Sequence, residues 1–220
     1  MKVIVTGTTG MVGQGILREA LADPDIKSVL SLSRAPIALQ DPKLTAMLVP
    51  DFYNLAALEP ALTGYDACLH GLGVSAVGMS EEAYTRVTYD LTLHLAQTLL
   101  RLNPGMSFCY VSGQGTDEAE RSRQMWARVK GRTENALLAL PFKHVHMFRP
   151  GFIEPGPGIL AKTAWYRWLY RLLWPFFGLF RLMPGLATTS GKLGRAMIRA
   201  ARGGYEDAVL GNRDINRLGA

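Results

Sequence analysis

Val3-Ile4-Val5-Thr6-Gly7-Thr8-Thr9-Gly10-Met11-Val12-Gly13 opens the chain, and the helical run Gln14-Gly15-Ile16-Leu17 follows it directly. The apolar run before the first glycine predicts a buried strand. The three glycines suit a tight strand-to-helix turn, an approach of bare backbone to a pyrophosphate, and close packing of the helix on the strand. A helix that begins at such a turn presents unpaired N–H groups and the positive end of its dipole to a phosphate. We therefore expect a dinucleotide to bind at Gly7, Thr8, Thr9, Gly10, Met11, Val12 and Gly13.

Strand-length apolar runs alternate with longer helical runs up to residue 148. The predicted strands are Lys2–Thr6, Ser28–Ser33, Thr45–Val49, Ala67–Leu72, Met106–Val111 and His144–Phe148. The predicted helices are Met11–Ala22, Leu55–Leu62, Glu81–Leu102 and Arg121–Leu140. Such an alternation requires right-handed crossovers, and it predicts a parallel sheet with helices on both faces.

The rhythm breaks after Phe148 into a Pro/Gly stretch and an aromatic segment. A helix around Lys192 to Ala201 and a short strand near Ala208 to Leu210 follow. The predicted fold is therefore α/β, a Rossmann-type doubly wound parallel sheet with a small C-terminal helical cap. We expect one domain, with a core at 1–153, an aromatic, basic cap at 154–205, and a terminal strand and tail at 206–220.

The composition of the chain suits a globular domain with its own core. It has 220 residues, of which 48% are hydrophobic and 19% are charged, which excludes disordered, collagen-like and coiled-coil classes. Cys68 and Cys109 each lie within a predicted buried strand, and the spacing of Cys and His matches no metal site. The N-terminal apolar run is too short for a signal peptide. These features predict free thiols, no bound metal and a cytoplasmic location.

The positive charge of the chain is concentrated in one segment. The formal net charge is +6, but residues 155–205 contain no Asp or Glu. That segment carries +8, from Lys162, Arg167, Arg171, Arg181, Lys192, Arg195, Arg199 and Arg202. The rest of the chain is slightly acidic and holds no recognised nucleic-acid motif, so we expect no nucleic-acid partner.

The end of the second predicted strand bears on which dinucleotide binds. An acidic residue there would bond the ribose 2′-hydroxyl of NAD, whereas an arginine accommodates the 2′-phosphate of NADP. The sequence has Ser33-Arg34, with no carboxylate before Asp41. Since Arg34 can pair with a phosphate through charge-assisted hydrogen bonds, NADP(H) is favoured over NAD(H).

Further motifs follow the other predicted strands. They are Asp51-Phe52, Tyr110-Val111-Ser112-Gly113, Lys130-Gly131 and Arg149-Pro150-Gly151. With the glycine turn and Ser33-Arg34, they make the chain resemble the extended and atypical short-chain dehydrogenase/reductases. It is most similar to the small NAD(P)H-binding, epimerase/dehydratase-like proteins related to the Tat-interacting oxidoreductase-like protein, and the similarity covers essentially the whole chain.

The resemblance implies roles for several residues. Asp51, followed by Phe52, would lie by the adenine, and Gly71 and Gly73 would line the adenosine side. Ser112 would orient a substrate carbonyl. The backbone after Pro150, at Gly151, would meet the nicotinamide.

The family's catalytic helix carries Tyr-x-x-x-Lys, in which the lysine holds the nicotinamide ribose and lowers the tyrosine pKa. In this chain the same register reads Trp126-Ala127-Arg128-Val129-Lys130. An indole N–H can donate a hydrogen bond, but it exchanges no proton near neutral pH. Trp126 therefore cannot be the general acid or base.

Three interpretations of Trp126 stay open. Another residue can supply the proton: Tyr110, two residues before Ser112, or Tyr84 or Tyr166 brought in by folding. Alternatively the acceptor is quinone-like or a flavin and takes its proton from solvent. In the third, the protein binds NADP(H) without turnover and acts as a regulator or assembly factor.

The aromatic segment from Trp165 to Met183 holds three of the chain's four tryptophans. Its three arginines make a membrane span costly. It can roof a hydrophobic substrate or form a homodimer contact. The basic stretch 162–202 can instead meet an anionic membrane surface from the periphery. The predicted function is an NADP(H)-dependent oxidoreductase or epimerase/dehydratase-like enzyme on a hydrophobic carbonyl or quinone-like substrate, with the silent binding protein as the alternative.

Overall fold

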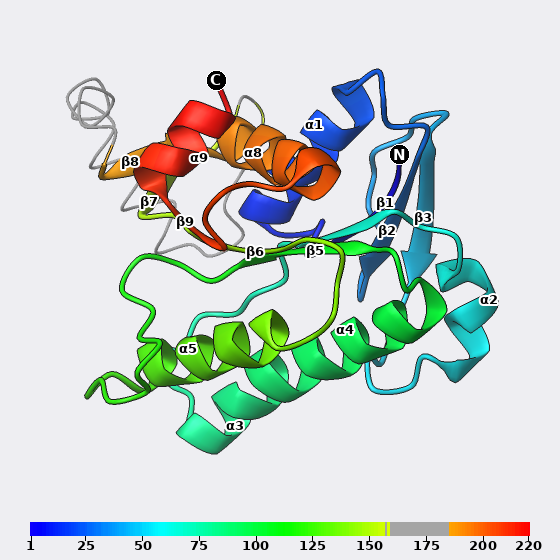
Figure 1. Cartoon of the computed structure of the whole chain (residues 1–220). Coiled ribbons are helices and arrows are strands. Elements are labelled where there is room, and N and C mark those ends of the chain that lie inside the picture. Colours follow the sequence, from blue (N-terminus) through cyan, green and yellow to red (C-terminus); the bar gives the residue numbers. More distant parts are fainter. Residues whose placement is uncertain (157, 159–184) are drawn as a thin grey trace.

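Seven parallel strands form the central sheet, in the order β3-β2-β1-β4-β5-β6-β9 (Figure 1). The computed structural model describes residues 1–156, 158 and 185–220. The strands are β1 (Lys2–Thr6), β2 (Ser28–Ser33), β3 (Leu44–Leu48), β4 (Ala67–His70), β5 (Ser107–Val111), β6 (Val145–Arg149) and β9 (Val209–Gly211). This order confirms the predicted Rossmann-type fold, with the direction of the strand order reversing between β1 and β4.

Helices cover both faces of the sheet (Figure 1). On one side lie α1 (Met11–Ala22), α8 (Ser190–Gly203) and α9 (Asn212–Leu218). On the other lie α3 (Glu81–Thr85), α4 (Leu91–Leu102) and α5 (Met125–Leu138), and α2 (Glu59–Leu62) packs against α4 after a short 3₁₀ turn at Ala56–Leu58. The predicted helix over 81–102 forms as α3, a π-helical turn at Arg86–Asp90 and α4.

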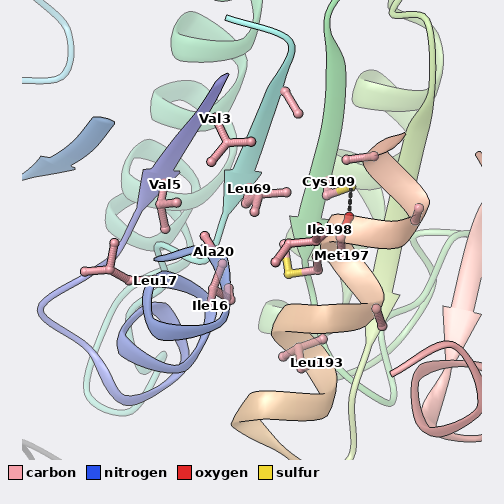
Figure 2. Close-up of a cluster of buried hydrophobic side chains, with 14 of the residues drawn as sticks. Val3, Val5, Ile16, Leu17, Ala20, Leu69, Cys109, Leu193, Met197 and Ile198 are labelled. Carbon is pink, nitrogen blue, oxygen red and sulfur yellow. Dashed lines mark hydrogen bonds between the residues drawn. The ribbon is translucent and has the colours of Figure 1, made fainter. Parts of the chain in front are cut away.

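Alternation along each strand builds two hydrophobic cores. Val3, Val5, Leu69 and Cys109 face α1 and α8, as Figure 2 shows. Ile4 belongs to the opposite core, with the side chains of α4 and α5. Because side chains of a strand point alternately to the two faces, a strand buried on both faces must be apolar throughout.

Helix α8 belongs to the core layer, which differs from the predicted assignment of its residues to a cap. It packs closely along α1, and Leu193, Met197 and Ile198 are buried against the sheet. The two helices can approach because of glycines at their crossing: a Cβ on Gly15 would lie 2.5 Å from the Ser190 Cβ. The basic composition of this stretch suggested a region separate from the core. In the structure, the apolar face of α8 packs on the sheet beside α1.

The arginines of α8 are engaged by the rest of the chain. Arg195 pairs with Glu19 at 3.0 Å, and Arg202 pairs with Asp23 and Asp25, each at 2.9 Å. Arg199 donates to the carbonyl oxygens of Leu218 and Ala220. The α8 arginines of the stretch 162–202 therefore bind acidic side chains and backbone of the body, and contact of this stretch with an anionic membrane surface stays a prediction.

Other differences from the predicted elements are local. A two-stranded parallel sheet joins β7 (Phe152–Glu154) to β8 (Ala187–Thr189), and the expected tail contains α9. Strand β4 ends at His70, and α5 begins at Met125. The aromatic segment 165–183, with Tyr166, lies outside the described residues, as do Lys162, Arg167, Arg171 and Arg181. In the described ranges, no helix is both long and apolar enough to cross a membrane.

The α1–α8 crossing predicts the effect of one added methyl group. Gly15→Ala places a Cβ against Ser190, so we expect a loss of about 1–3 kcal/mol in the free energy of unfolding despite the better helix propensity of alanine. Gly203→Ala is the matched control, since a Cβ there meets nothing within 4 Å. Urea titration of both variants is the measurement. Equal stabilities would contradict the close crossing.

Candidate functional site

A cavity of about 730 Å3 lies at the carboxyl ends of the strands, where the strand order reverses. Open α/β sheets bind ligands at this position. The loop after β1 forms one wall, Gly71 to Ser75 after β4 form another, and the ends of β5 and β6 with α5 form the rest. Of the predicted site residues, the lining includes Gly7, Thr9, Gly10, Met11, Val12, Ser33, Arg34, Gly71, Gly73, Ser112, Lys130, Pro150 and Gly151.

Two glycines of the turn are required by the packing of the chain itself. Gly7 has a φ of +73°, and a Cβ on it would lie 2.5 Å from the Gly71 carbonyl oxygen. A Cβ on Gly13 would lie 2.1 Å from the Gly7 carbonyl oxygen. These contacts bring the start of α1 against the ends of β1 and β4, so the turn is held tightly.

Two other glycines line the cavity, and a Cβ on either would meet fewer atoms of the chain. Gly10 caps α1 in an extended conformation that any residue adopts, and a Cβ there meets only the Gly7 oxygen, at 3.3 Å. A Cβ on Gly73 meets nothing within 4 Å. Bare backbone that faces a cavity, where the chain leaves more room than at Gly7 and Gly13, fits a ligand that approaches closely.

The described lining of the cavity is positively charged. Its charged side chains are Arg34 and Lys130, and it holds no Asp, Glu, His, Tyr or Cys. The first turn of α1 carries no acidic residue, so its N–H groups and dipole also favour an anion. The chemistry of this donor set fits a phosphate-bearing ligand. No cluster of three potential metal-binding side chains occurs among the residues that the structure describes.

Ser112 and Lys130 lie together at the deep end of the cavity. Ser112 is buried, and its hydroxyl donates to the Phe148 carbonyl oxygen at 3.1 Å. The Lys130 ammonium donates to the Ser112 carbonyl oxygen. Burial lowers the pKa of Lys130 to about 8, and the negative charge of Glu134 opposes this shift. An ammonium with such a pKa can release and regain a proton near neutral pH.

Trp126 does not line this cavity in the structure. It lies one helical turn before Lys130 on α5, with its ring against the loop that follows β5. A Cβ on Gly115, whose φ is +87°, would lie 3.1 Å from the Cη2 atom of Trp126. The indole therefore packs on that loop.

The tyrosines considered as substitute proton donors are core residues. Tyr110 and Tyr84 are each 2% exposed, and neither lines the cavity. Burial raises the pKa of both hydroxyls. Both side chains lie outside the described cavity lining, with the Tyr110 ring 5.7 Å from that of His70, so the structure does not bring Tyr110 or Tyr84 to the cavity as the expected proton donor.

Besides Gly13, which packs against Gly7, three predicted cofactor residues do not belong to the cavity lining. Thr8 is buried beneath the turn, where its hydroxyl bonds that of Ser31 at 2.8 Å. Phe52 is a core residue. Asp51 is exposed, accepts a hydrogen bond from the Tyr53 N–H, and does not line the cavity. The adenine contact that the resemblance implied for Asp51 stays a prediction.

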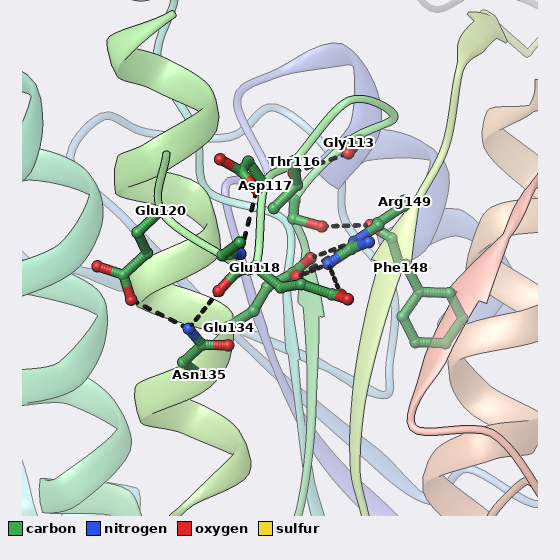
Figure 3. Close-up of polar contacts among 11 residues, drawn as sticks. Gly113, Thr116, Asp117, Glu118, Glu120, Glu134, Asn135, Phe148 and Arg149 are labelled. Atoms are coloured by element: carbon green, nitrogen blue, oxygen red, sulfur yellow. Dashed lines mark hydrogen bonds and ion pairs between the residues drawn. The ribbon is translucent and has the colours of Figure 1, made fainter. Parts of the chain in front are cut away.

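The sequence reasoning missed residues that hold the cavity wall. Asn212 of α9 accepts a hydrogen bond from the Gly151 N–H at 3.0 Å. Glu134 of α5 binds Arg149, which directly precedes Pro150 (Figure 3). The signal for the second contact was an acidic residue one turn after Lys130, paired with the arginine of the Arg149-Pro150-Gly151 motif.

Known proteins are similar to this chain in sequence and in fold. No protein-family model matches the chain. The mitochondrial protein FMP52 of Chaetomium globosum is 26% identical over 234 residues, covering 98% of this chain and 96% of the relative. The HTATIP2 protein of Rattus norvegicus is 26% identical over 228 residues, covering 99% of this chain and 88% of the relative. The chain is an atypical short-chain dehydrogenase/reductase.

Solved structures of this family's fold agree with the architecture. MoeE5 in complex with UDP-glucose and NAD superposes with a TM-score of 0.70 at 19% identity, covering 96% of this chain and 76% of MoeE5. This likeness supports the Rossmann-type fold. The sequence relatives confirm the family predicted from the glycine turn and the later motifs.

His70 predicts a pH dependence of stability. It is fully buried between Thr6 and Thr92, and burial lowers its pKa to about 3 from 6.5. Below pH 6.5, His70 binds a proton in the unfolded chain but not in the folded chain. Its contribution to the free energy of unfolding is therefore complete above pH 6.5 and falls as the pH is lowered. We expect a slope of up to about 1.4 kcal/mol per pH unit from His70.

His70→Gln places a side-chain amide near both threonines and removes the titrating group. The change in the free energy of unfolding with pH should therefore become smaller by that amount. Urea titrations from about pH 7 to about pH 5 measure it. His94→Gln is the control, since His94 on α4 is partly exposed. An unchanged slope in His70→Gln would contradict the assignment.

Proposed function

We propose that the chain binds NADP(H) in the cavity between the glycine turn and Lys130. The observation that carries this proposal is the bare backbone of Gly10 at the start of α1, in a lining whose charged side chains are Arg34 and Lys130. The turn would hold the pyrophosphate at the N-terminus of α1. Lys130 and the backbone at Gly151 lie at the end expected for the nicotinamide.

Arg34 supports a preference for the 2′-phosphorylated dinucleotide. Its side chain is exposed at the end of β2, and no described carboxylate lines the cavity to bond a free 2′-hydroxyl. The Ser33 hydroxyl donates its hydrogen bond to the Ala35 carbonyl oxygen at 2.7 Å, so its proton is not available to a phosphate. The phosphate would therefore depend on Arg34.

A fluorescence titration with NADPH and NADH tests this proposal. Arg34→Gln should weaken NADPH binding about 10- to 100-fold, because a charge-assisted bond to the phosphate is lost, and leave NADH binding nearly unchanged. Gly10→Val, in a backbone conformation that valine adopts, should weaken both dinucleotides. Arg101→Gln, on α4, is the charge-matched control. A wild-type protein that binds neither dinucleotide would refute the function.

We further propose that the site reduces a hydrophobic carbonyl or quinone-like compound. Bound NADPH supplies the hydride for such chemistry. Apolar side chains of Leu72, Val74, Phe152 and Ile153 line the cavity, which suits an apolar substrate. Lys130 is the described lining residue that can give up a proton near neutral pH, and water can restore it. Epimerase or dehydratase chemistry is less supported, since no carboxylate or histidine lies in the described lining.

Trp126 favours a second candidate, a silent NADP(H)-binding regulator or assembly factor. The family's tyrosine is replaced, and the two described tyrosines considered as substitutes lie in the core. A panel of carbonyl and quinone compounds separates the candidates. NADPH oxidation with any of them supports the reductase, whereas tight NADPH binding without oxidation across the panel supports the regulator.

Trp126→Tyr tests the register of the catalytic helix. We expect NADPH affinity to stay within about threefold of wild type, because Trp126 packs on the loop at Gly115 and outside the cavity lining. Gain of NADPH oxidation on the panel would show that the missing proton donor limits the wild type. Loss of dinucleotide binding would show that the assumed register is wrong.

Two further expectations belong to this proposal. A homodimer or an anionic membrane surface remains the proposed partner of the C-terminal segment, and the membrane contact would use basic residues of 162–202. The FMP52 relatives are named mitochondrial. Cell fractionation, with a high-salt wash of the membranes, tests the location of this chain. The cytoplasmic location expected from the sequence stays a prediction.

A further inference from the structure

A buried carboxylate lies directly behind the cavity wall. Glu134 is 1% exposed, and both of its oxygens accept bonds from Arg149. The Nε atom lies 3.1 Å from each oxygen, and Nη2 lies 2.5 Å from Oε2. Arg149 also pairs with Glu118 at 3.0 Å, as Figure 3 shows. A bidentate pair of this kind fixes orientation as well as charge.

The pair joins two walls of the cavity. Glu134 lies one helical turn after Lys130 on α5, so the two side chains share a face of the helix. Arg149 ends β6 and is followed by Pro150 and Gly151, which line the cavity. The contact therefore ties the helix that carries Lys130 to the strand end that would meet the nicotinamide.

Charged groups of the described residues near Lys130 come from α5, β6 and the loop after β5. On α5 and β6 they are Glu134 and Arg149, with Glu118 beyond them and the buried hydroxyl of Tyr110 on β5. On the side of α3, Glu81 pairs with Arg128. Glu134 is the group whose charge acts on Lys130, and it raises the lysine pKa against the effect of burial. Without it, burial alone would favour the neutral amine.

We propose that Glu134 is the positioning residue for Lys130: held in place by Arg149, its carboxylate keeps charged the ammonium group that binds the Ser112 carbonyl oxygen at the cavity. Arg149 fixes the carboxylate in the ionised form, which a buried glutamate would otherwise lose. The role of Lys130 in proton transfer rests on the proposed reductase function, whereas its charge coupling to Glu134 does not.

The test measures the protonation of Lys130 without any dinucleotide. Trace acetylation with acetic anhydride, quantified for the Lys130 peptide by mass spectrometry over a pH series, gives the midpoint of its titration. Glu134→Gln should lower that midpoint and raise acetylation at pH 7 about three- to fivefold, since the neutral amine becomes more populated. A purely structural ion pair would leave the midpoint where it is.

Two variants provide matched controls. Glu118→Gln removes the same charge from the same arginine, but Glu118 is 69% exposed and lies on a loop, so the midpoint should stay at the wild-type value. Glu134→Asp keeps the negative charge, and its midpoint should stay closer to wild type than that of Glu134→Gln. A wild-type midpoint in Glu134→Gln, or an equal shift in Glu118→Gln, would overturn the proposal.

Glu134→Gln can fail to fold, because it leaves the Arg149 charge partly buried without its partner. The double variant Glu134→Gln with Arg149→Met removes both charges, which proteins often tolerate. Its midpoint should also lie below wild type, and an unchanged midpoint counts against the proposal. Since NADPH titration is a separate measurement, loss of the proposed function and loss of the coupling are distinguishable.

Discussion

The close backbone approach at the start of α1 is the constraint on which the rest of the site depends. A Cβ on Gly13 would lie 2.1 Å from the Gly7 oxygen, and one on Gly7 would lie 2.5 Å from the Gly71 oxygen. These contacts leave no room for side chains, so β1, α1 and the end of β4 meet as bare backbone. The N–H groups of α1 are thereby directed into the space where the strand order reverses.

Local patterns predicted this part of the molecule well. The strands are apolar on both faces because both faces are covered, and the glycine spacing reports a turn that is completed within a few residues. Twelve of the sixteen predicted cofactor residues accordingly line the cavity. The positions that failed have a common cause. Tyr110 and Phe52 lie near the ends of strands in sequence, but their depth depends on which helix covers that face, and this is decided by residues far along the chain.

Long-range pairing explains the other differences. The basic residues of α8 suggested a surface cap, yet Arg195 and Arg202 bind Glu19, Asp23 and Asp25, which lie more than a hundred positions earlier. The two members of such a pair are too far apart in the sequence for local composition to reveal their contact. The same holds for Glu134 and Arg149, which are close in sequence but belong to a helix and a strand whose packing the pattern does not specify.

The chain thus separates two halves of the family's machinery. The half that we propose for phosphate binding consists of backbone and Arg34, and its geometry follows from Gly7 and Gly13, which the fold itself requires. In the half that the family uses for proton transfer, Trp126 stands at the tyrosine position of the family pattern and packs against Gly115 outside the described cavity lining. Lys130 nevertheless stays in the lining, beside Ser112, with a buried glutamate one turn away. A lysine that only bound ribose hydroxyls would need its charge but no shift toward neutrality. Burial lowers the pKa of Lys130 to about 8 and Glu134 opposes that shift, so the amine lies close to the balance between its two protonation states.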